Sequence, residues 1–368
     1  MSTTAQTYTK ENPFSADLIL NKKLNKEGSQ KDTRHFEISL AGSDISYLPG
    51  DALYVFAENE DSLVNELLDL ITLKQTHESE FVRFKTEVNI TRASSKLFSL
   101  INSKLDPDKQ LDSKEMMERF NGYNLVNILK ELKQEITLEI DSDELAQNSS
   151  KLMPRAYSIA SSLKAHPEEV HLCIARVEEE INSQKVLGVC SNFLSDRVEL
   201  NAKNVRVYVH ENNRFRLPEN KETDIIMIGP GTGIAPFRAF IEERNIDRDN
   251  KEKVGKDWLF FGDQRKDFDY IYGEELDQYQ EKYGLQITTA FSRDQEEKVY
   301  VQHKMQEHKD EIFSMLEKGA HFYVCGDAKR MAKDVDTCLR EIITANNKDA
   351  DAYMKELKDS GRYQRDIY

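Results

Sequence analysis

The alternation of apolar and polar residues changes character along the chain, and its first part is typical of antiparallel strands. Between residues 13 and 58 the two kinds of residue alternate over short runs. Residues 35–40 and 52–56 are predicted strands, and Pro49-Gly50-Asp51 is a predicted turn between them. The lone His35 on such a strand is more often structural than a ligand. The same alternation of apolar and polar residues returns from about residue 141 to 218.

Helical periodicity interrupts this antiparallel region. After Asp61-Ser62, apolar residues recur three and four positions apart, which predicts a helix over 61–71. Similar spacing predicts helices over 96–101, 114–120 and 125–132. We therefore expect a helical subdomain at 62–140, inserted between the two parts of an antiparallel domain at 1–61 and 141–218.

The last part of the chain alternates short apolar runs with helical stretches, which is typical of a parallel α/β sheet. Its predicted strands are 225–228, 258–261, 286–291 and 321–325. This rhythm predicts a third domain at 219–368.

Composition narrows the class of protein. The 368 residues carry 66 acidic and 51 basic side chains, a formal charge of −15, which argues against nucleic acid as the main partner. The four cysteines are scattered without a C-x-x-C pair, so we expect no metal site. No apolar stretch is long enough to span a membrane, and the N-terminus has no signal-peptide pattern. We expect a cytoplasmic protein.

A glycine turn follows the strand at 225–228. Gly231 and Gly233 flank Thr232, and Pro236 suits the first turn of a helix. Backbone N–H groups at such a helix start bind phosphate, so the pattern predicts a nucleotide site. A ligand-free glycine turn is the alternative, because the third glycine of the dinucleotide fingerprint is missing.

Two further groups of residues carry candidate chemistry. In the run RAYS, Arg155 can clamp a phosphate, Tyr157 can lie against a flavin ring, and Ser158 can bond to the flavin edge. A strand without a ligand is the alternative there. After the strand at 286–291 come residues suited to a 2′-phosphate, which NADP has and NAD lacks: Ser292, Arg293, Lys298, Tyr300 and Gln302. A solvated charged surface is the alternative for this set.

Several sequence motifs resemble those of the ferredoxin-NADP reductase-like enzymes. Within that family they are most similar to the diflavin reductases that supply electrons for sulfite reduction. These motifs are GPGTGIAPFRAF, YLPGDALYV, RAYS and the CGD that begins at Cys325. The helical insertion is similar to the connecting subdomain of diflavin reductases. The resemblance implies an antiparallel FAD-binding β-barrel with this insertion, followed by a parallel α/β NADP-binding domain.

The resemblance also implies roles for particular residues. FAD contacts are expected from Thr91, Arg155, Ala156, Tyr157, Ser158, Cys173, Ile174, Ala175, Gly188, Val189, Cys190, Ser191 and Tyr368. NADPH contacts are expected from Gly231, Thr232, Gly233, Ser292, Arg293, Lys298, Tyr300, Gln302 and Asp327, with Lys333 bordering the dinucleotide. Ser158, Cys325 and Asp366 are the expected catalytic group, which holds the hydride donor in line. Thr91 can equally be a helix cap, and Glu179 stands where the family often has an aromatic residue over the adenine.

The C-terminal Tyr368 is expected by resemblance to stack on the flavin where the nicotinamide must lie. The chain begins too late to contain the FMN domain of a diflavin reductase, so it is either an excised module or a short natural form. The expected function is an NADPH-dependent flavoprotein reductase whose partner is a protein electron acceptor: a sulfite-reducing hemoprotein, a flavodoxin or a separate FMN protein. The alternatives are a general ferredoxin/flavodoxin-NADP reductase and a non-catalytic assembly subunit.

Overall fold

The computed structural model describes residues 8–135 and 139–368. Tertiary contacts divide the chain into two compact units, each built from separate segments. Unit 1 comprises residues 1–54, 156–175 and 200–368, and unit 2 comprises residues 55–155 and 176–199. The first unit therefore joins the antiparallel strands to the whole α/β part, and the second holds the helical insertion.

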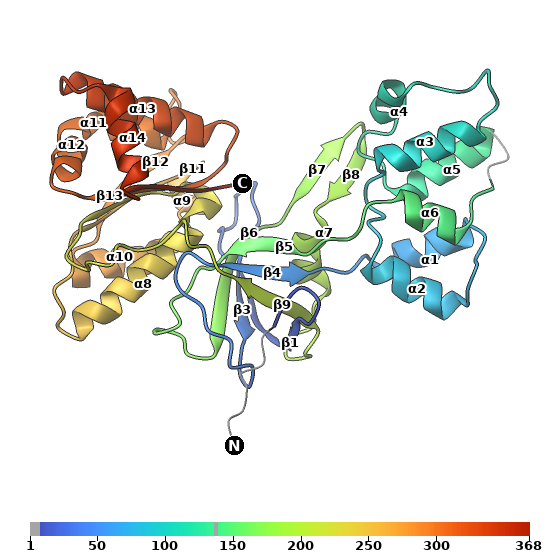
Figure 1. Cartoon of the computed structure of the whole chain (residues 1–368), viewed down its shortest axis with the longest axis horizontal. Coiled ribbons are helices and arrows are strands. Elements are labelled where there is room, and N and C mark those ends of the chain that lie inside the picture. Colours follow the sequence, from blue (N-terminus) through green and yellow to red (C-terminus); the bar gives the residue numbers. More distant parts are fainter. Residues whose placement is uncertain (1–7, 136–138) are drawn as a thin grey trace. The chain divides into compact units, whose positions relative to one another are not determined.

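The antiparallel part forms two sheets (Figure 1). One has the strand order β1-β9-β4-β5, with the bounds β1 Phe14–Ala16, β9 Val205–His210, β4 Ala52–Phe56 and β5 Arg155–Ser158. The other has the order β2-β3-β6, with the bounds β2 Leu18–Lys23, β3 Thr33–Ser39 and β6 Glu169–Ala175. The strand predicted at 52–56 is confirmed by β4, and the strand predicted at 35–40 agrees with β3 to within two residues.

The turn between these two strands is also confirmed. Gly50 has a φ of +99°, and a Cβ there would lie 1.9 Å from the carbonyl oxygen of Phe215. Only glycine fits this position, because both the backbone conformation and the close approach exclude a side chain.

The α/β part is a five-stranded parallel sheet with the order β12-β11-β10-β13-β14. Its strands are β10 Ile225–Ile228, β11 Asp257–Asp263, β12 Gln286–Phe291, β13 His321–Gly326 and β14 Tyr363–Ile367. The first four confirm the predicted strands. The fifth, β14, was not predicted, because YQRDI carries three polar residues and only Tyr363 among its five side chains is buried.

Helices lie on both faces of this sheet, as Figure 1 shows. Their bounds are η2 Gly231–Ile234, α8 Ala235–Asp249, α9 Lys266–Asp269, α10 Gly273–Tyr283, α11 Val301–Glu307, α12 Lys309–Glu317, α13 Met331–Ala345 and α14 Ala350–Asp359. Ile226 and Ile228 pack into one buried cluster, and Ile225 and Met227 into another. Both faces of β10 are therefore core, which explains its unbroken apolar run.

Unit 2 is mainly helical. Its helices are α1 Asp61–Asp69, α2 His77–Thr86, α3 Ser95–Lys104, α4 Ser113–Arg119, α5 Leu125–Glu135, α6 Ser142–Asn148, α7 Val189–Asn192 and the π-helix η1 Phe193–Arg197. The four predicted helices correspond to α1, α3, α4 and α5, whereas α2 and α6 were missed. The unit also contains the hairpin β7 Glu178–Ile181 with β8 Gln184–Leu187. Its loop residues Asn182 and Ser183 both have positive φ, as a type I′ turn requires.

The antiparallel sheets, followed in the chain by a parallel sheet, confirm the predicted fold class. Among the described helices, none combines the length and the apolar composition that crossing a membrane would require.

Candidate functional site

The parallel strands of unit 1 bring five candidate positions to one edge of the sheet. Gly229 follows β10, Ser292 follows β12, and Asp263, Cys325 and Asp366 lie at or near the carboxyl ends of β11, β13 and β14. The connections from β10 run outward in opposite directions, to β11 and eventually to β13. Ligands bind at such a switch point in open α/β sheets, so this edge is the candidate nucleotide site.

The glycine turn occupies the middle of this edge. Gly231 has a φ of +57°, as a left-handed turn residue should, and η2 leads directly into α8. Gly233, for which an approach to a pyrophosphate is expected, also packs closely inside the protein. A Cβ there would lie 2.2 Å from the carbonyl oxygen of Cys325, so this glycine lets η2 pack against β13.

Ser158, Asp366 and Cys325 come together. The Ser158 hydroxyl donates a hydrogen bond of 2.5 Å to Oδ2 of Asp366, and the Cys325 Sγ lies 4.0 Å from the same oxygen. Burial raises the pKa of Asp366, and the Ser158 hydrogen bond opposes that rise. Burial, reinforced by the Asp366 charge, also raises the pKa of the Cys325 thiol well above its ordinary value. The group can hold a proton or a hydrogen bond, but it is no thiolate nucleophile.

Tyr368 lies beside this group, and its backbone is fixed. Its N–H donates to the Gly326 carbonyl at 3.2 Å, and its carbonyl accepts from the Ala328 N–H at 3.0 Å. Its hydroxyl bonds to the Thr232 hydroxyl at 2.7 Å, yet 62% of the residue is exposed. The C-terminal residue is therefore held by three hydrogen bonds.

The residues expected around a 2′-phosphate lie after β12 and at the start of α11. Ser292 Oγ donates to the Asp263 carbonyl at 3.2 Å, and Arg293 donates to the Gln30 side chain at 2.9 Å. Lys298 is exposed, and Tyr300 is 43% exposed. Gln302 contacts Asp334 at 3.3 Å on the surface, so its amide is turned toward α13. These groups offer two accessible cations and a hydroxyl to an anion.

Asp327 and Lys333 border the same edge. The carboxylate of Asp327 accepts a 2.7 Å hydrogen bond from the Arg330 N–H, and such backbone donors lower its pKa. Asp327 therefore stabilises the turn before α13. Lys333 is exposed within the first turn of that helix.

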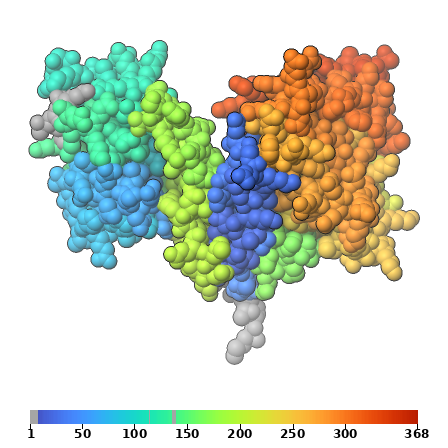
Figure 2. All heavy atoms as spheres, turned by 180° about the vertical axis from the view of Figure 1, so that it is seen from behind, coloured from blue at the N-terminus to red at the C-terminus, as the bar shows by residue number. Residues whose placement is uncertain are grey.

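The sequence reading missed Lys31, which the fold brings to the glycine turn. Its ammonium pairs with Asp263 at 2.5 Å, and a Cβ on Gly231 would lie 3.9 Å from it. Figure 2 shows the N-terminal segment, in blue, beside the α/β part in orange, and Asn25 bonds to Asp269 across the same surface at 2.9 Å. A lysine 200 residues before the turn carries no local signal of this neighbourhood. It adds a cation where a pyrophosphate would lie.

The expected flavin residues of unit 1 lie on β5 and β6. Tyr157 and Ser158 are half-buried and Ala156 is exposed. On β6, Cys173 and Ile174 are buried and Ala175 is exposed at the strand end. Burial raises the pKa of Cys173 to about 12, so this thiol is neutral.

Three of the expected flavin residues of unit 2 line one pocket. Thr91, Gly188 and Val189 contribute to it, together with Asn59 and Asn192. Both asparagine side chains are buried, and among the described residues their Oδ1 atoms have no hydrogen-bond partner. Such acceptors fit a ligand with hydroxyl or amino donors, which the ribityl, ribose and adenine groups of FAD possess.

Three of the expected unit 2 residues also make contacts within the protein. Thr91 is no helix cap, because its hydroxyl donates to Asn89 at 2.9 Å and α3 is capped by Ser94. Ser191 accepts from the Val177 N–H at 3.1 Å, so its hydroxyl is already engaged. Cys190 is buried, and its Sγ faces the Val55 carbonyl at 3.9 Å.

Unit 2 holds three further charged residues that bear on a cofactor site, of which only Arg197 lines this pocket. Arg155 is exposed at the start of β5. Arg197, which was not predicted, lines the pocket, donates to the Glu58 carbonyl at 2.8 Å and has its pKa lowered by burial. Glu179 is exposed on the hairpin, and the structure gives it no role.

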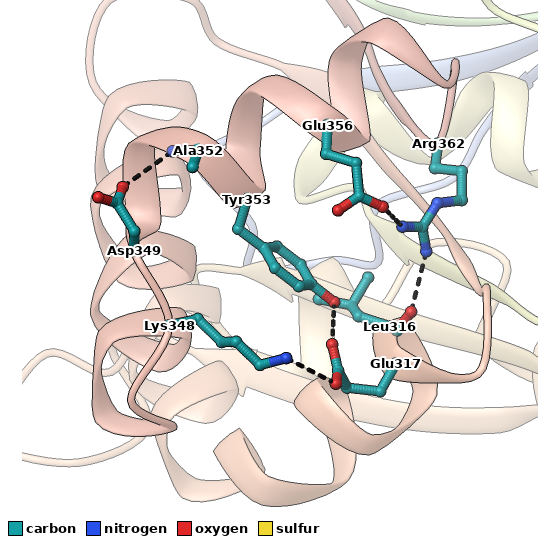
Figure 3. A pocket seen from close by; sticks show the side chains of 8 residues that line it. All are labelled: Leu316, Glu317, Lys348, Asp349, Ala352, Tyr353, Glu356 and Arg362. Atoms are coloured by element: carbon teal, nitrogen blue, oxygen red, sulfur yellow. Dashed lines mark hydrogen bonds and ion pairs between the residues drawn. The ribbon is translucent and has the colours of Figure 1, made fainter.

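A further pocket in unit 1 lies at the opposite, amino-terminal edge of β14 (Figure 3). Glu317 accepts from Lys348 at 3.1 Å and from the Tyr353 hydroxyl at 2.9 Å, and Arg362 pairs with Glu356 at 2.9 Å. Its charged side chains are thus matched among themselves. It is separate from the nucleotide edge of the sheet.

The fold and these sites define a protein of the ferredoxin-NADP reductase-like class. Comparison with known families agrees: the FAD binding domain family matches residues 6–98 and 95–193, and the oxidoreductase NAD-binding domain matches residues 227–337. The chain belongs to the FAD binding domain family, and its C-terminal part is an oxidoreductase NAD-binding domain.

Curated relatives carry one name. The chain is 40% identical to the sulfite reductase [NADPH] flavoprotein alpha-component of Photobacterium profundum, over 98% of this chain and 61% of the relative. It is 39% identical to that of Mannheimia succiniciproducens, over 99% of this chain and 62% of the relative. For Vibrio cholerae the values are 40%, 100% and 61%. The chain thus spans about three fifths of the length of these relatives.

Proposed function

We propose that the chain is the FAD- and NADPH-binding reductase part of a sulfite reductase flavoprotein. It would take a hydride from NADPH and pass electrons to a protein acceptor, for the reduction of sulfite to sulfide. The observation that carries this proposal is the group of Ser158, Asp366 and Cys325 beside the glycine turn. When bound, FAD would accept two electrons as a hydride and release them one at a time.

We assign the nicotinamide end of the site to this group. The Asp366 carboxylate fixes the Ser158 hydroxyl, and the fixed hydroxyl can then orient a reacting ring by a hydrogen bond. The Tyr368 ring is held by Thr232 and must rotate for Cys325 to contact a nicotinamide. Because the Tyr368 backbone is bonded to Gly326 and Ala328, rotation of its side chain is the cheapest opening movement.

We assign the phosphates of NADPH to the cations along the same edge. The N–H groups at the start of η2 and the Lys31 ammonium suit the pyrophosphate. Ser292, Arg293, Lys298 and Tyr300 suit the 2′-phosphate, because that dianion needs charge-assisted donors. Gln302, Asp327 and Lys333 contribute to the border of this site.

We assign the FAD contacts within each unit taken by itself. In unit 1 these are Tyr157, Ser158 and residues 173–175. In unit 2, Arg155 and the segment 188–191 suit the pyrophosphate, and Thr91 suits the flavin. Arg197 and the two unsatisfied asparagine oxygens support a polar ligand in the unit 2 pocket.

The domain limits follow from these assignments. We propose an FAD-binding domain at 1–61 and 141–218, a connecting subdomain at 62–140 and an NADP-binding domain at 219–368. The cytoplasmic location stays a prediction.

The first test is spectroscopic. The purified chain should be yellow, should contain one FAD per chain and should lose its flavin absorbance when NADPH is added without oxygen. A colourless chain that takes up neither FAD nor NADPH would instead support the assembly-subunit alternative.

The acceptor is tested separately. Pull-down with a siroheme hemoprotein, followed by NADPH-dependent sulfide production, tests the link to sulfite. A chain that reduces flavodoxin or ferredoxin but neither binds nor reduces the hemoprotein would be a general ferredoxin/flavodoxin-NADP reductase.

A further inference from the structure

Strands β3 and β6 of unit 1 present a row of metal-ligand side chains on one face. His35 and Glu37 alternate along β3, and Glu169 and His171 alternate along β6, so each pair points to the same side. Glu37 lies directly opposite His171 in the antiparallel register. His35, Glu37 and His171 place ligand atoms within 4.8 Å of one another, as do His166, Glu169 and His171.

The second of these groups has the better geometry. The His171 Nε2 lies 3.2 Å from Oε2 of Glu169, and the His166 Nδ1 lies 4.0 Å from the same oxygen. In a tetrahedral zinc site, ligand atoms about 2.0–2.2 Å from the metal are roughly 3.3–3.5 Å apart. The Glu169–His171 distance is thus already close to this spacing, and the Glu169–His166 distance exceeds it by about 0.5–0.7 Å.

A further carboxylate already orients His166. The Nε2 of His166 lies 3.1 Å from Oε1 of Glu242, on α8. A ligating histidine normally donates its other ring N–H to such a carboxylate, and this bond leaves the His166 Nδ1 lone pair directed away from Glu242. His166 and Glu169 are 30% and 36% exposed, whereas His171 is 2% exposed. An ion could therefore enter from solvent and reach a buried ligand.

One cation stands close to this group. The Arg238 guanidinium lies 3.4 Å from the His171 Nδ1, but it pairs with Glu242 and Glu275, each at 2.8 Å, and donates to the Ala160 carbonyl at 2.6 Å. Its charge is thus matched by two carboxylates. Metal binding at Nε2 places the His171 proton on Nδ1, so the 3.4 Å contact with Arg238, the longest that Arg238 makes here, is lost because a guanidinium cannot accept a hydrogen bond.

We propose that His166, Glu169 and His171 form a divalent transition-metal site, with zinc as the fitting ion. Glu37, on the neighbouring strand, groups with His35 and His171 rather than with His166 and Glu169, so the fourth position is left to solvent. The ion would tie the segment before β6 to β6 itself and, through His166 and Glu242, to α8. The scattered cysteines of the sequence predict no such site, because its ligands come from histidine and glutamate residues that only strand pairing collects.

The experiment uses the full chain, stripped with a chelator, incubated with zinc chloride and desalted. Metal analysis should find about one zinc per chain, and zinc should raise the melting temperature. With cobalt(II) as the probe, visible absorption typical of a four-coordinate site should appear.

Variants identify the ligands. Glu169→Gln keeps the side-chain volume and removes the charge, and His166→Ala removes an exposed ligand; each should weaken zinc binding at least tenfold. Glu242→Gln should weaken it 10–100-fold, as loss of an outer partner does at other metal sites. The matched control is His77→Ala, an exposed histidine of α2 in unit 2, which should bind zinc like the wild type.

Three results would overturn the assignment. The first is a wild-type chain, folded by circular dichroism, that retains neither zinc nor cobalt. The second is equal retention by the wild type and by Glu169→Gln. The third is loss of binding in His35→Ala but not in His166→Ala, which would transfer the ion to the His35 group. Flavin content and NADPH oxidation are measured in parallel, so failure of the reductase proposal would be seen independently.

Discussion

Replacing Asp366 by asparagine should make the chain more stable at neutral pH and a slower reductase. The substitution keeps the size of the side chain but removes the negative charge that accepts the 2.5 Å hydrogen bond from Ser158. A hydrogen bond to a charged group contributes about 1.5–3 kcal/mol and a neutral one about 0.5–1.5 kcal/mol. If the difference, about 1–1.5 kcal/mol, is lost from orientation of the reacting ring, flavin reduction slows roughly 5- to 13-fold.

The effect on stability has the opposite sign and depends on pH. Burial raises the pKa of Asp366 above its ordinary value, so the folded chain holds this proton more tightly than the unfolded chain does. The stability from protonated Asp366 is complete below the unfolded pKa, about 3.9, and is lost as the pH rises through the higher folded pKa. At pH 7 the buried charge of Asp366 therefore lowers the free energy of unfolding, and Asp366→Asn removes that charge.

Two measurements test the expected decrease in the rate of flavin reduction and the expected increase in stability. Stopped-flow reduction by NADPH gives the hydride-transfer rate, and thermal melting between pH 4 and pH 8 gives the change in stability. The gain in melting temperature of Asp366→Asn over wild type should grow with pH across that range. Asp359→Asn is the matched control, because Asp359 is exposed and pairs only with Lys355 at the end of α14. An unchanged rate, together with a variant that is less stable than wild type at pH 7, would refute this account.

Four further predictions concern single positions. Arg293→Ala should raise the KM for NADPH by one to two decades, the loss of a charge-assisted phosphate contact of about 1.5–3 kcal/mol, and leave the KM for NADH unchanged in steady-state assays; equal changes for both would exclude the 2′-phosphate site. Cys325→Ala should slow stopped-flow flavin reduction about 10–100-fold with FAD still bound, whereas a merely packed thiol would affect only the melting temperature. Tyr368→Ala should improve the use of NADH proportionally more than that of NADPH and perturb the flavin spectrum, and no change in either would remove the gating role. Gly233→Ala should destabilise the chain by about 1–3 kcal/mol in urea unfolding, because its Cβ would lie 2.2 Å from the Cys325 carbonyl oxygen; wild-type stability would mean that β13 can move.

Local patterns predicted most of the fold. The strand from Ile225 to Ile228 and the turn at Gly231 depend only on neighbouring residues. The unbroken apolar run and the backbone freedom of glycine therefore suffice to predict them. The strand β14 was missed because its own sequence is largely polar. It is held in the sheet by pairing with β13, which lies about 40 residues earlier in the chain. The helices α2 and α6 were missed because short polar helices depend on caps, Thr76 and Asp141 here, more than on a long apolar stripe.

Of the site residues, only those that belong to motifs shared with the family could be predicted. Ser158 and Asp366 are 208 positions apart, and no spacing rule connects them. Lys31 and the unsatisfied Asn59 and Asn192 carry no motif at all. They become candidates only when folding places them beside the glycine turn or in the unit 2 pocket. The packing of Gly233 against the Cys325 carbonyl oxygen also carries no sequence signal, because its motif predicts ligand contact only.

The interleaved segments of the two units have a consequence for how the protein is made. The chain passes between the units at residues 54/55, 155/156, 175/176 and 199/200. Unit 2 therefore lacks part of its chain until residue 199 has left the ribosome, and residues 8–54 must wait longer still for the α/β segments of their own unit. Synthesis cannot proceed here as one finished domain followed by the next. A nascent chain of about 150 residues already contains the apolar core of the unit 2 helices, whereas β1 and β3 still lack their partners β9 and β6, so the antiparallel strands of unit 1 are the part that must wait.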